Sequence, residues 1–200
     1  VKLDGVGRVS NNHGVELAGS AGVRLRIFAA GGTNSTSSPA IEIKGRVEHG
    51  WSRRAVSSGY WASTMNHNLI EARGEGGISI LGERSTGDDY TLSLTGTSLF
   101  SRIGTIHIAS NAGNNGIRFA EGYYGVSTYM GAATTSNVTR VAQSPAELTN
   151  DATIFTSSAA IDIRADMFYS DGQDEWVSHT AGDISIRPVA AQFRAMPYIY

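Results

Sequence analysis

Short segments in which apolar and polar residues alternate recur along the whole chain, and they constrain its fold more than any other feature. In a typical segment two large aliphatic residues flank one polar residue, as in Ile41-Glu42-Ile43 and Ile106-His107-Ile108. Successive side chains of a strand point to opposite faces, so this period of two predicts half-buried strands. The pattern is found at Val15–Leu17, Val23–Ile27, Ile41–Lys44, Ile78–Ile80, Leu92–Leu94, Ile106–Ile108, Ile117–Phe119, Ile161–Ile163 and Ile184–Ile186.

The spacing of these segments favours a repeat. Ile78, Leu92 and Ile106 are 14 residues apart and Ile117 follows after 11, while other gaps are longer. Steps of this size are typical of the rungs of a repeat or the strands of a meander. Each segment has too few apolar residues to bury a core alone, so stacking along an axis or against neighbouring chains is expected to complete it. We therefore predict an all-β chain, an elongated trimeric β-helix or β-prism-like fibre domain, with a β-sandwich as the alternative.

Composition supports short strands and excludes several classes of function. Glycine accounts for 24 of 200 residues, and only 17% of residues are charged. The net charge of -2 comes with no basic stripe, so no nucleic-acid partner is expected. No apolar run approaches the ~20 residues that span a bilayer, so no membrane insertion is expected. The absence of cysteine excludes disulfides and thiolate metal sites.

We interpret residues 1–200 as a single repetitive β region. The chain starts at Val1 with neither an initiator methionine nor a signal peptide, which is expected of a fragment of a longer chain. Two stretches with little clean alternation, 48–73 and 121–157, are predicted to be loop-rich insertions. The second contains Ser144-Pro145-Ala146-Glu147, a capping-box sequence that predicts a short helix to about Asn150.

Motifs for catalysis are weak. The five histidines stand far apart, so neither a metal site nor a cofactor is expected, and no serine lies in a Gly-x-Ser-x-Gly elbow. Glycoside hydrolysis needs two carboxylates roughly 5–9.5 Å apart across a sugar. No pattern selects a pair, so the catalytic residues are unknown and a binding protein is favoured over an enzyme; the candidate acids are Glu71, Glu75, Glu83, Asp88 and Asp89.

Aromatic residues in the two irregular stretches give the best indication of a binding site. Flat aromatic faces beside short polar side chains suit sugar rings, which offer both apolar faces and hydroxyl groups. The competing interpretation is that these residues fill the core beneath loops or pack between subunits. The candidate ligand-binding residues are Trp51, Tyr60, Trp61, Tyr123, Tyr124 and Tyr129.

The chain resembles the distal parts of bacteriophage tail fibres and tailspikes. The resemblance covers nearly all 200 residues and rests on cysteine-free, Gly/Ser/Thr/Asn-rich sequence with short strands such as Ala40-Ile41-Glu42-Ile43-Lys44-Gly45, Gly104-Thr105-Ile106-His107-Ile108 and Ala160-Ile161-Asp162-Ile163-Arg164. It implies a parallel homotrimer with β-helical or β-prism segments, located in the virion tail and acting outside the cell. It also implies binding of a bacterial surface polysaccharide or an outer-membrane receptor. Some members cleave polysaccharides, including hyaluronan lyases built as triple-stranded β-helices, so a depolymerase (lyase or glycoside hydrolase) is the alternative function.

Overall fold

The described part of the chain is built mainly from β-strands. The computed structural model describes residues 1–8, 12–17, 25–33, 35, 38–48, 54–58, 68–84, 90–95, 97–110, 116–120, 129–131, 160–166, 168–170, 175–176, 183–189 and 192–193. Every regular element in these residues is a strand, which confirms the all-β prediction. The same residues contain no helix with the length and apolar character needed to cross a membrane.

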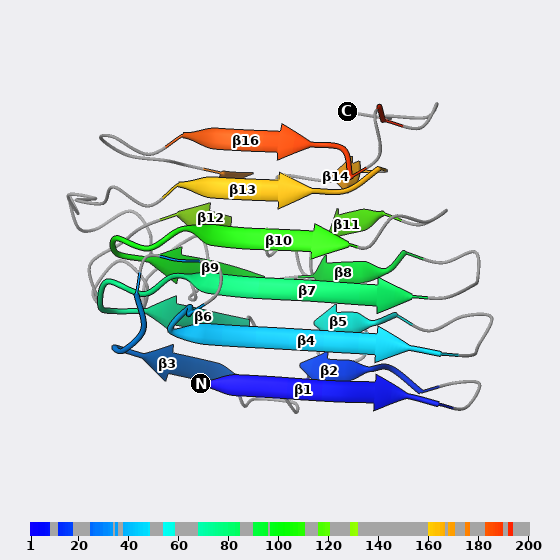
Figure 1. Cartoon of the computed structure of the whole chain (residues 1–200), viewed down its shortest axis with the longest axis horizontal. Coiled ribbons are helices and arrows are strands. Elements are labelled where there is room, and N and C mark those ends of the chain that lie inside the picture. The colour runs from blue at the N-terminus through cyan, green and yellow to red at the C-terminus, as the bar shows by residue number, and fades with distance from the viewer. Residues whose placement is uncertain are drawn as a thin grey trace, which may run out of the picture.

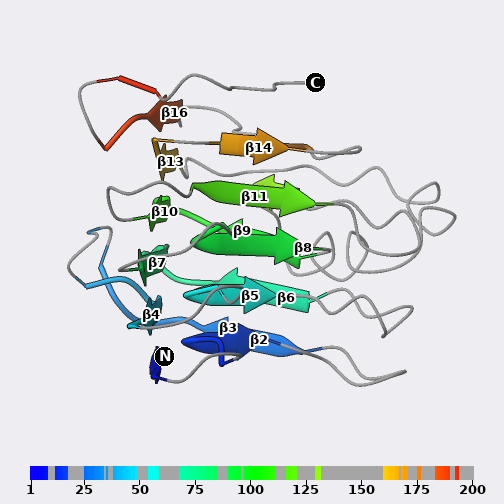
Figure 2. The same cartoon turned by 90° about the vertical axis from the view of Figure 1, so that its right-hand side faces the viewer.

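The strands form three sheets, which we number 1 to 3 (Figures 1 and 2). Sheet 1 contains, in spatial order, β1 (Lys2–Gly7), β4 (Ile41–Val47), β7 (Ile78–Arg84), β10 (Ile106–Ser110), β13 (Ile161–Arg164) and β16 (Ile184–Arg187). Sheet 2 contains β2 (Val15–Leu17), β5 (Val56–Ser58), β8 (Leu92–Thr95), β11 (Ile117–Ala120) and β14 (Phe168–Ser170). Sheet 3 contains β3 (Arg26–Ala29), β6 (Asn68–Ala72), β9 (Thr97–Ser101), β12 (Tyr129–Gly131) and β15 (Glu175–Trp176).

Each strand from β1 to β13 pairs in parallel with the strand three positions later in the sequence. The chain therefore passes through one strand of sheet 1, one of sheet 2 and one of sheet 3, and then returns to the next strand of sheet 1 (Figure 1). This passage repeats from β1 to β16, and we call each repeat a turn of the stack. Neighbouring strands of a sheet lie about 4.8 Å apart, so each turn advances the chain by that distance. The β-sandwich alternative, which is built from antiparallel sheets, is wrong for the described strands.

The register shows what the spacing of the sequence segments means. Ile41, Ile78, Ile106, Ile161 and Ile184 occupy equivalent positions on consecutive strands of sheet 1. One turn therefore takes 37, 28, 55 and then 23 residues. The 14-residue step from Ile78 to Leu92 crosses from sheet 1 to sheet 2 and is part of a turn, not a whole one. Turn length varies because the connections between strands vary, while the strands remain in register.

The core lies between the three sheets and is built from columns of aliphatic side chains. In sheet 1 one column contains Ile41, Ile78, Ile106 and Ile161, and the adjacent column contains their partners two residues later; all are at most 1% exposed. Sheets 2 and 3 contribute Val56, Leu92, Ile117, Ile70 and Leu99, which are fully buried. Burying such a side chain stabilises the fold by roughly 1.5–3 kcal/mol. Two apolar residues per strand suffice because the same position recurs in every turn.

The last turn of the stack exposes its apolar side chains. Ile184 and Ile186 continue the two buried columns of sheet 1 but are 44% and 37% exposed. Val189 and Phe193, which follow β16, are 43% and 41% exposed. At the opposite end Val1 is 55% exposed. Among the described strands, β1 and β16 each pair on one side only, so both ends of sheet 1 present open edges.

The two stretches interpreted as insertions also contribute strands. β5 and β6 lie within residues 48–73, and β12 lies within residues 121–157. These strands belong to sheets 2 and 3, so both stretches supply strands to the repeating order of the three sheets. The short helix expected at 144–150 lies outside the described residues.

Candidate functional site

The outer face of sheet 1 carries most of the charged side chains that the structure describes on strands. In its first three strands these charges are balanced and partly paired. Lys2 lies 3.2 Å from Glu42, and Lys44 lies 2.9 Å from Glu83, whose hydrogen bond and charge raise the pKa of Lys44. The outward charges of β1, β4 and β7 are three cations and three carboxylates, so their sum is zero; they are Lys2, Lys44, Arg46, Asp4, Glu42 and Glu83.

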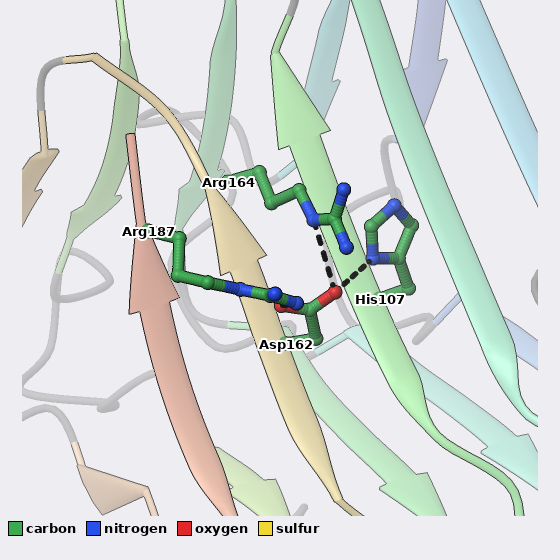
Figure 3. A network of polar contacts seen from close by, with 4 residues as sticks. All are labelled: His107, Asp162, Arg164 and Arg187. Atoms are coloured by element: carbon green, nitrogen blue, oxygen red, sulfur yellow. Dashed lines mark hydrogen bonds and ion pairs between the residues drawn. The ribbon is translucent and has the colours of Figure 1, made fainter. Parts of the chain in front are cut away.

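The last three strands of the same face carry a different arrangement, centred on the Asp162 carboxylate of β13 (Figure 3). Arg187 Nη2 donates to Asp162 Oδ1 at 2.7 Å, and Arg164 Nε donates to Oδ2 at 3.2 Å. The ring Nδ1 of His107 lies 3.0 Å from the same Oδ2. The parallel register produces this cluster, because it pairs His107 of β10 with Asp162, and Arg164 with Arg187 of β16. We call these four residues the Asp162 cluster.

The protonation states of the Asp162 cluster follow from burial and charge. Burial alone would raise the pKa of Asp162, but the hydrogen bond from Arg187 and the charge of Arg164 outweigh it, so the pKa lies below 3.8. Burial lowers the pKa of His107 below 6.5, and the attraction of Asp162 offsets only part of this effect. At pH 7 Asp162 is therefore ionised and His107 is neutral. An ionised carboxylate only accepts hydrogen bonds, so His107 Nδ1 carries the proton and donates it.

The Asp162 cluster has an excess of positive charge at an exposed surface. One carboxylate faces two guanidinium groups, and the neutral imidazole does not change the balance. The Asp162 side chain is 13% exposed, whereas those of Arg164 and Arg187 are 47% and 54% exposed. The negative charge is therefore covered by its partners, while the positive groups face solvent. Such an arrangement can bind an anion.

We expect nuclear magnetic resonance titration of the His107 ring protons to give a pKa below 6.5. Replacing Asp162 with asparagine should lower it further, because the charge that favours the imidazolium is lost while Arg164 and Arg187 remain. A pKa at or above 6.5, or a rise in the Asp162→Asn variant, would contradict this account of the cluster.

The same shifts predict the direction in which stability depends on pH. The unfolded chain binds a proton at His107 more readily than the folded chain, so the free energy of unfolding falls as the pH drops below 6.5. Asp162 acts in the same direction near and below pH 3.8, where its stabilising contribution is lost as the pH falls through its folded-state pKa.

A second polar cluster lies on sheet 3. Glu71 of β6 is 3% exposed and accepts a hydrogen bond from Arg73 Nε at 2.8 Å. The Arg73 guanidinium carbon lies 4.2 Å from the centre of the Phe28 ring, a cation–π geometry. Phe28 and Glu71 are register partners on neighbouring strands. This arrangement satisfies the buried carboxylate and covers one face of an aromatic ring.

The candidate catalytic acids do not converge where they are described. Glu71 lies on sheet 3 and pairs with Arg73, whereas Glu83 lies on sheet 1 and pairs with Lys44. Glu75 lies in the turn between β6 and β7 and is exposed. Asp88 and Asp89 lie outside the described residues. No group of three or more potential metal-ligating side chains occurs in the part of the chain that the structure describes.

Of the six aromatic candidates for sugar binding, the structure describes only the backbone of Tyr129. Trp51, Tyr60, Trp61, Tyr123 and Tyr124 lie outside the described residues. The backbone of Tyr129 lies in β12 and pairs with Ser98 and Glu175. The role of all six in binding stays a prediction.

Sequence reasoning missed the Asp162 cluster. A signal was present, since His107 and Asp162 each stand between two isoleucines and therefore had to point away from the core. Their proximity depends on strand pairing across 55 residues, which alternation alone does not reveal. Comparison of the chain with models of known protein families, with curated proteins and with solved structures gives no match. The function is therefore argued from the fold and its surfaces.

Proposed function

We propose that this chain is a segment of a bacteriophage tail fibre or tailspike that attaches the virion to a bacterial surface polysaccharide or outer-membrane receptor. In this proposal the three parallel sheets form a β-helix, three chains assemble as a homotrimer, and the segment is part of the virion tail. The observation that carries the proposal is the parallel stack with open, apolar ends. Further turns can be added at β1 or β16 without changing the register of the existing strands, as the shaft of a fibre requires.

The surface of the stack is consistent with attachment. A rigid scaffold of paired strands can carry binding groups on its outer faces and on the connections between strands. The half-exposed arginines of sheet 1 supply donors for oxygen-rich ligands such as glycans. Binding is preferred to depolymerase activity because Glu71 and Glu83, two of the candidate acids that the structure describes, are each paired with a cation and lie on different sheets.

The oligomeric state tests the assembly. We expect multi-angle light scattering of the purified chain to give a mass near three times 21.2 kDa that persists on dilution. Exposed Ile184 and Ile186 are available for burial by other chains. A monomer at all concentrations would contradict the homotrimer and count against the fibre.

Adsorption to bacteria tests attachment itself. The fluorescently labelled chain is incubated with a panel of encapsulated and capsule-free strains, and bound fluorescence is measured per cell. Periodate oxidises the vicinal diols of glycans, whereas protease removes surface proteins. Loss of binding after periodate alone would identify a polysaccharide receptor, and loss after protease alone would identify a protein. Binding to no strain in the panel would count against attachment by this segment.

A further inference from the structure

We propose that Arg164 and Arg187 together form a binding site for the carboxylate group of an acidic sugar in a surface polysaccharide. The choice of a sugar rests on the proposed function, whereas the recognition of a carboxylate rests on the geometry of the Asp162 cluster. Three features carry the inference: the placement of the two guanidinium groups, the way Asp162 holds them, and the uneven charge of the face.

Arg164 and Arg187 are register partners on the adjacent strands β13 and β16, so their side chains leave the same face of sheet 1 side by side. Each is about half exposed, at 47% and 54%. Ser185 of β16, the register partner of Asp162, points to the same face. The surface therefore places two planar cations and a hydroxyl group next to one another, within reach of a sugar that carries both carboxylate and hydroxyl groups.

Asp162 holds both arginines in position. It accepts from one nitrogen of each group, Nε of Arg164 and Nη2 of Arg187, and it uses a different oxygen for each. A long arginine side chain loses considerable conformational freedom when it binds a ligand, and holding it in place beforehand reduces that cost. Asp162 is thus a positioning residue, since it acts through the arginines and is itself largely covered.

The charge balance directs an anion to this end of the face. The outward charges of β1, β4 and β7 cancel, and the described cations Lys2 and Lys44 are paired with carboxylates. In the Asp162 cluster two guanidinium groups share one carboxylate, which leaves one positive charge uncompensated. A guanidinium group presents a planar fork of donors that matches the two oxygens of a carboxylate. A polysaccharide with a carboxylate in every repeat would add avidity in a trimer, where three such sites are linked.

The test measures binding of polyuronate and of free acidic sugars to the purified chain in its native assembly. Alginate is compared with its carboxyl-reduced form, and sodium glucuronate and N-acetylneuraminate are compared with glucose. We expect binding of alginate and of at least one free acid, with little binding of reduced alginate or glucose. Equal binding of alginate and its carboxyl-reduced form would overturn the proposal.

Variants locate the site. The double variant Arg164→Gln/Arg187→Gln should bind alginate about tenfold more weakly or worse, because a charge-assisted hydrogen bond is lost at each arginine. The matched control is Arg46→Gln on β4, which is also exposed, at 55%, and lies outside the Asp162 cluster. An equal loss in the control would show diffuse attraction to the whole face and would contradict a defined site.

Two further measurements distinguish recognition by the guanidinium groups from simple charge attraction and from loss of folding in a variant. Arg164→Lys/Arg187→Lys keeps both charges but removes the planar fork, so it should lose most of the affinity; full retention would overturn recognition by paired guanidinium groups. In the unaltered chain, glucuronate should shift the Nε–H resonances of Arg164 and Arg187 but not that of Arg46. Absence of these shifts at saturating glucuronate would overturn the site without relying on any variant.

These tests distinguish failure of the carboxylate site from failure of the attachment proposal. If the chain is trimeric and adsorbs to bacteria but the double glutamine variant adsorbs equally well, this site is wrong while attachment stands. If the chain binds glucuronate through the two arginines but is monomeric and adsorbs to no strain, the carboxylate site stands and the fibre proposal is wrong.

Discussion

Ile80→Ala is expected to lower the free energy of unfolding by about 3–4 kcal/mol, whereas Ile184→Ala should cost less than about 1.5 kcal/mol. Both residues are inward-pointing isoleucines of sheet 1, so the chemical change is the same. Ile80 is fully buried between its register partners Ile43 and Ile108, and alanine there leaves a cavity inside the stack. Ile184 is 44% exposed on the last strand, so less of its surface is removed from water on folding.

Guanidinium unfolding followed by tryptophan fluorescence measures both variants, since the chain has three tryptophans. A lower midpoint with an unchanged slope reports stability alone. Losses of equal size would mean that another chain or another segment covers Ile184. In that case the difference should reappear on dilution below the concentration at which the assembly dissociates.

The positions of many strands could be predicted from the sequence, because alternation reports directly on burial. Ile41–Lys44 and Ile161–Ile163 fall within β4 and β13, and their isoleucines are buried as expected. Strands with few large aliphatic residues were missed. β5 is Val-Ser-Ser and β9 begins Thr-Ser, and here the hydroxyl groups satisfy each other inside the protein: Ser58 Oγ lies 2.6 Å from Thr97 Oγ1. A buried serine looks the same in a sequence as an exposed one.

The pairing of the strands could not be read from alternation. A period of two tells which face a side chain occupies but not which strand lies beside it. The turns of this chain differ in length from 23 to 55 residues along sheet 1, so no fixed period identifies partners. For the same reason the separate sequence positions of His107, Asp162 and Arg187 gave no sign that they meet. A polar residue between two aliphatic ones is therefore a candidate for an outward-facing cluster, and the register decides which candidates come together.

Gly45→Ala is expected to lower the free energy of unfolding by at least about 2 kcal/mol, because the added methyl group meets backbone that cannot move aside. A Cβ at this position would overlap the carbonyl oxygen and the carbonyl carbon of Ala55. The register pairs Gly45 with Gly5 in the turn before and Gly82 in the turn after, so glycine recurs where sheet 1 approaches sheet 2. The close approach of two backbones, rather than an unusual dihedral angle, requires glycine here.

Two controls make the Gly45 prediction specific. Gly31→Ala adds the same methyl group where nothing lies within 4 Å, so its stability should stay within about 0.5 kcal/mol of the parent chain. Gly82→Ala should fall between the two, because the nearest atoms belong to the Leu92 and Thr91 side chains, which can rotate. The measurement is the guanidinium midpoint of all three variants. If Gly45→Ala is as stable as Gly31→Ala, the strands β4 and β5 do not approach as closely as this corner requires, and the packing of sheet 1 against sheet 2 would have to be revised.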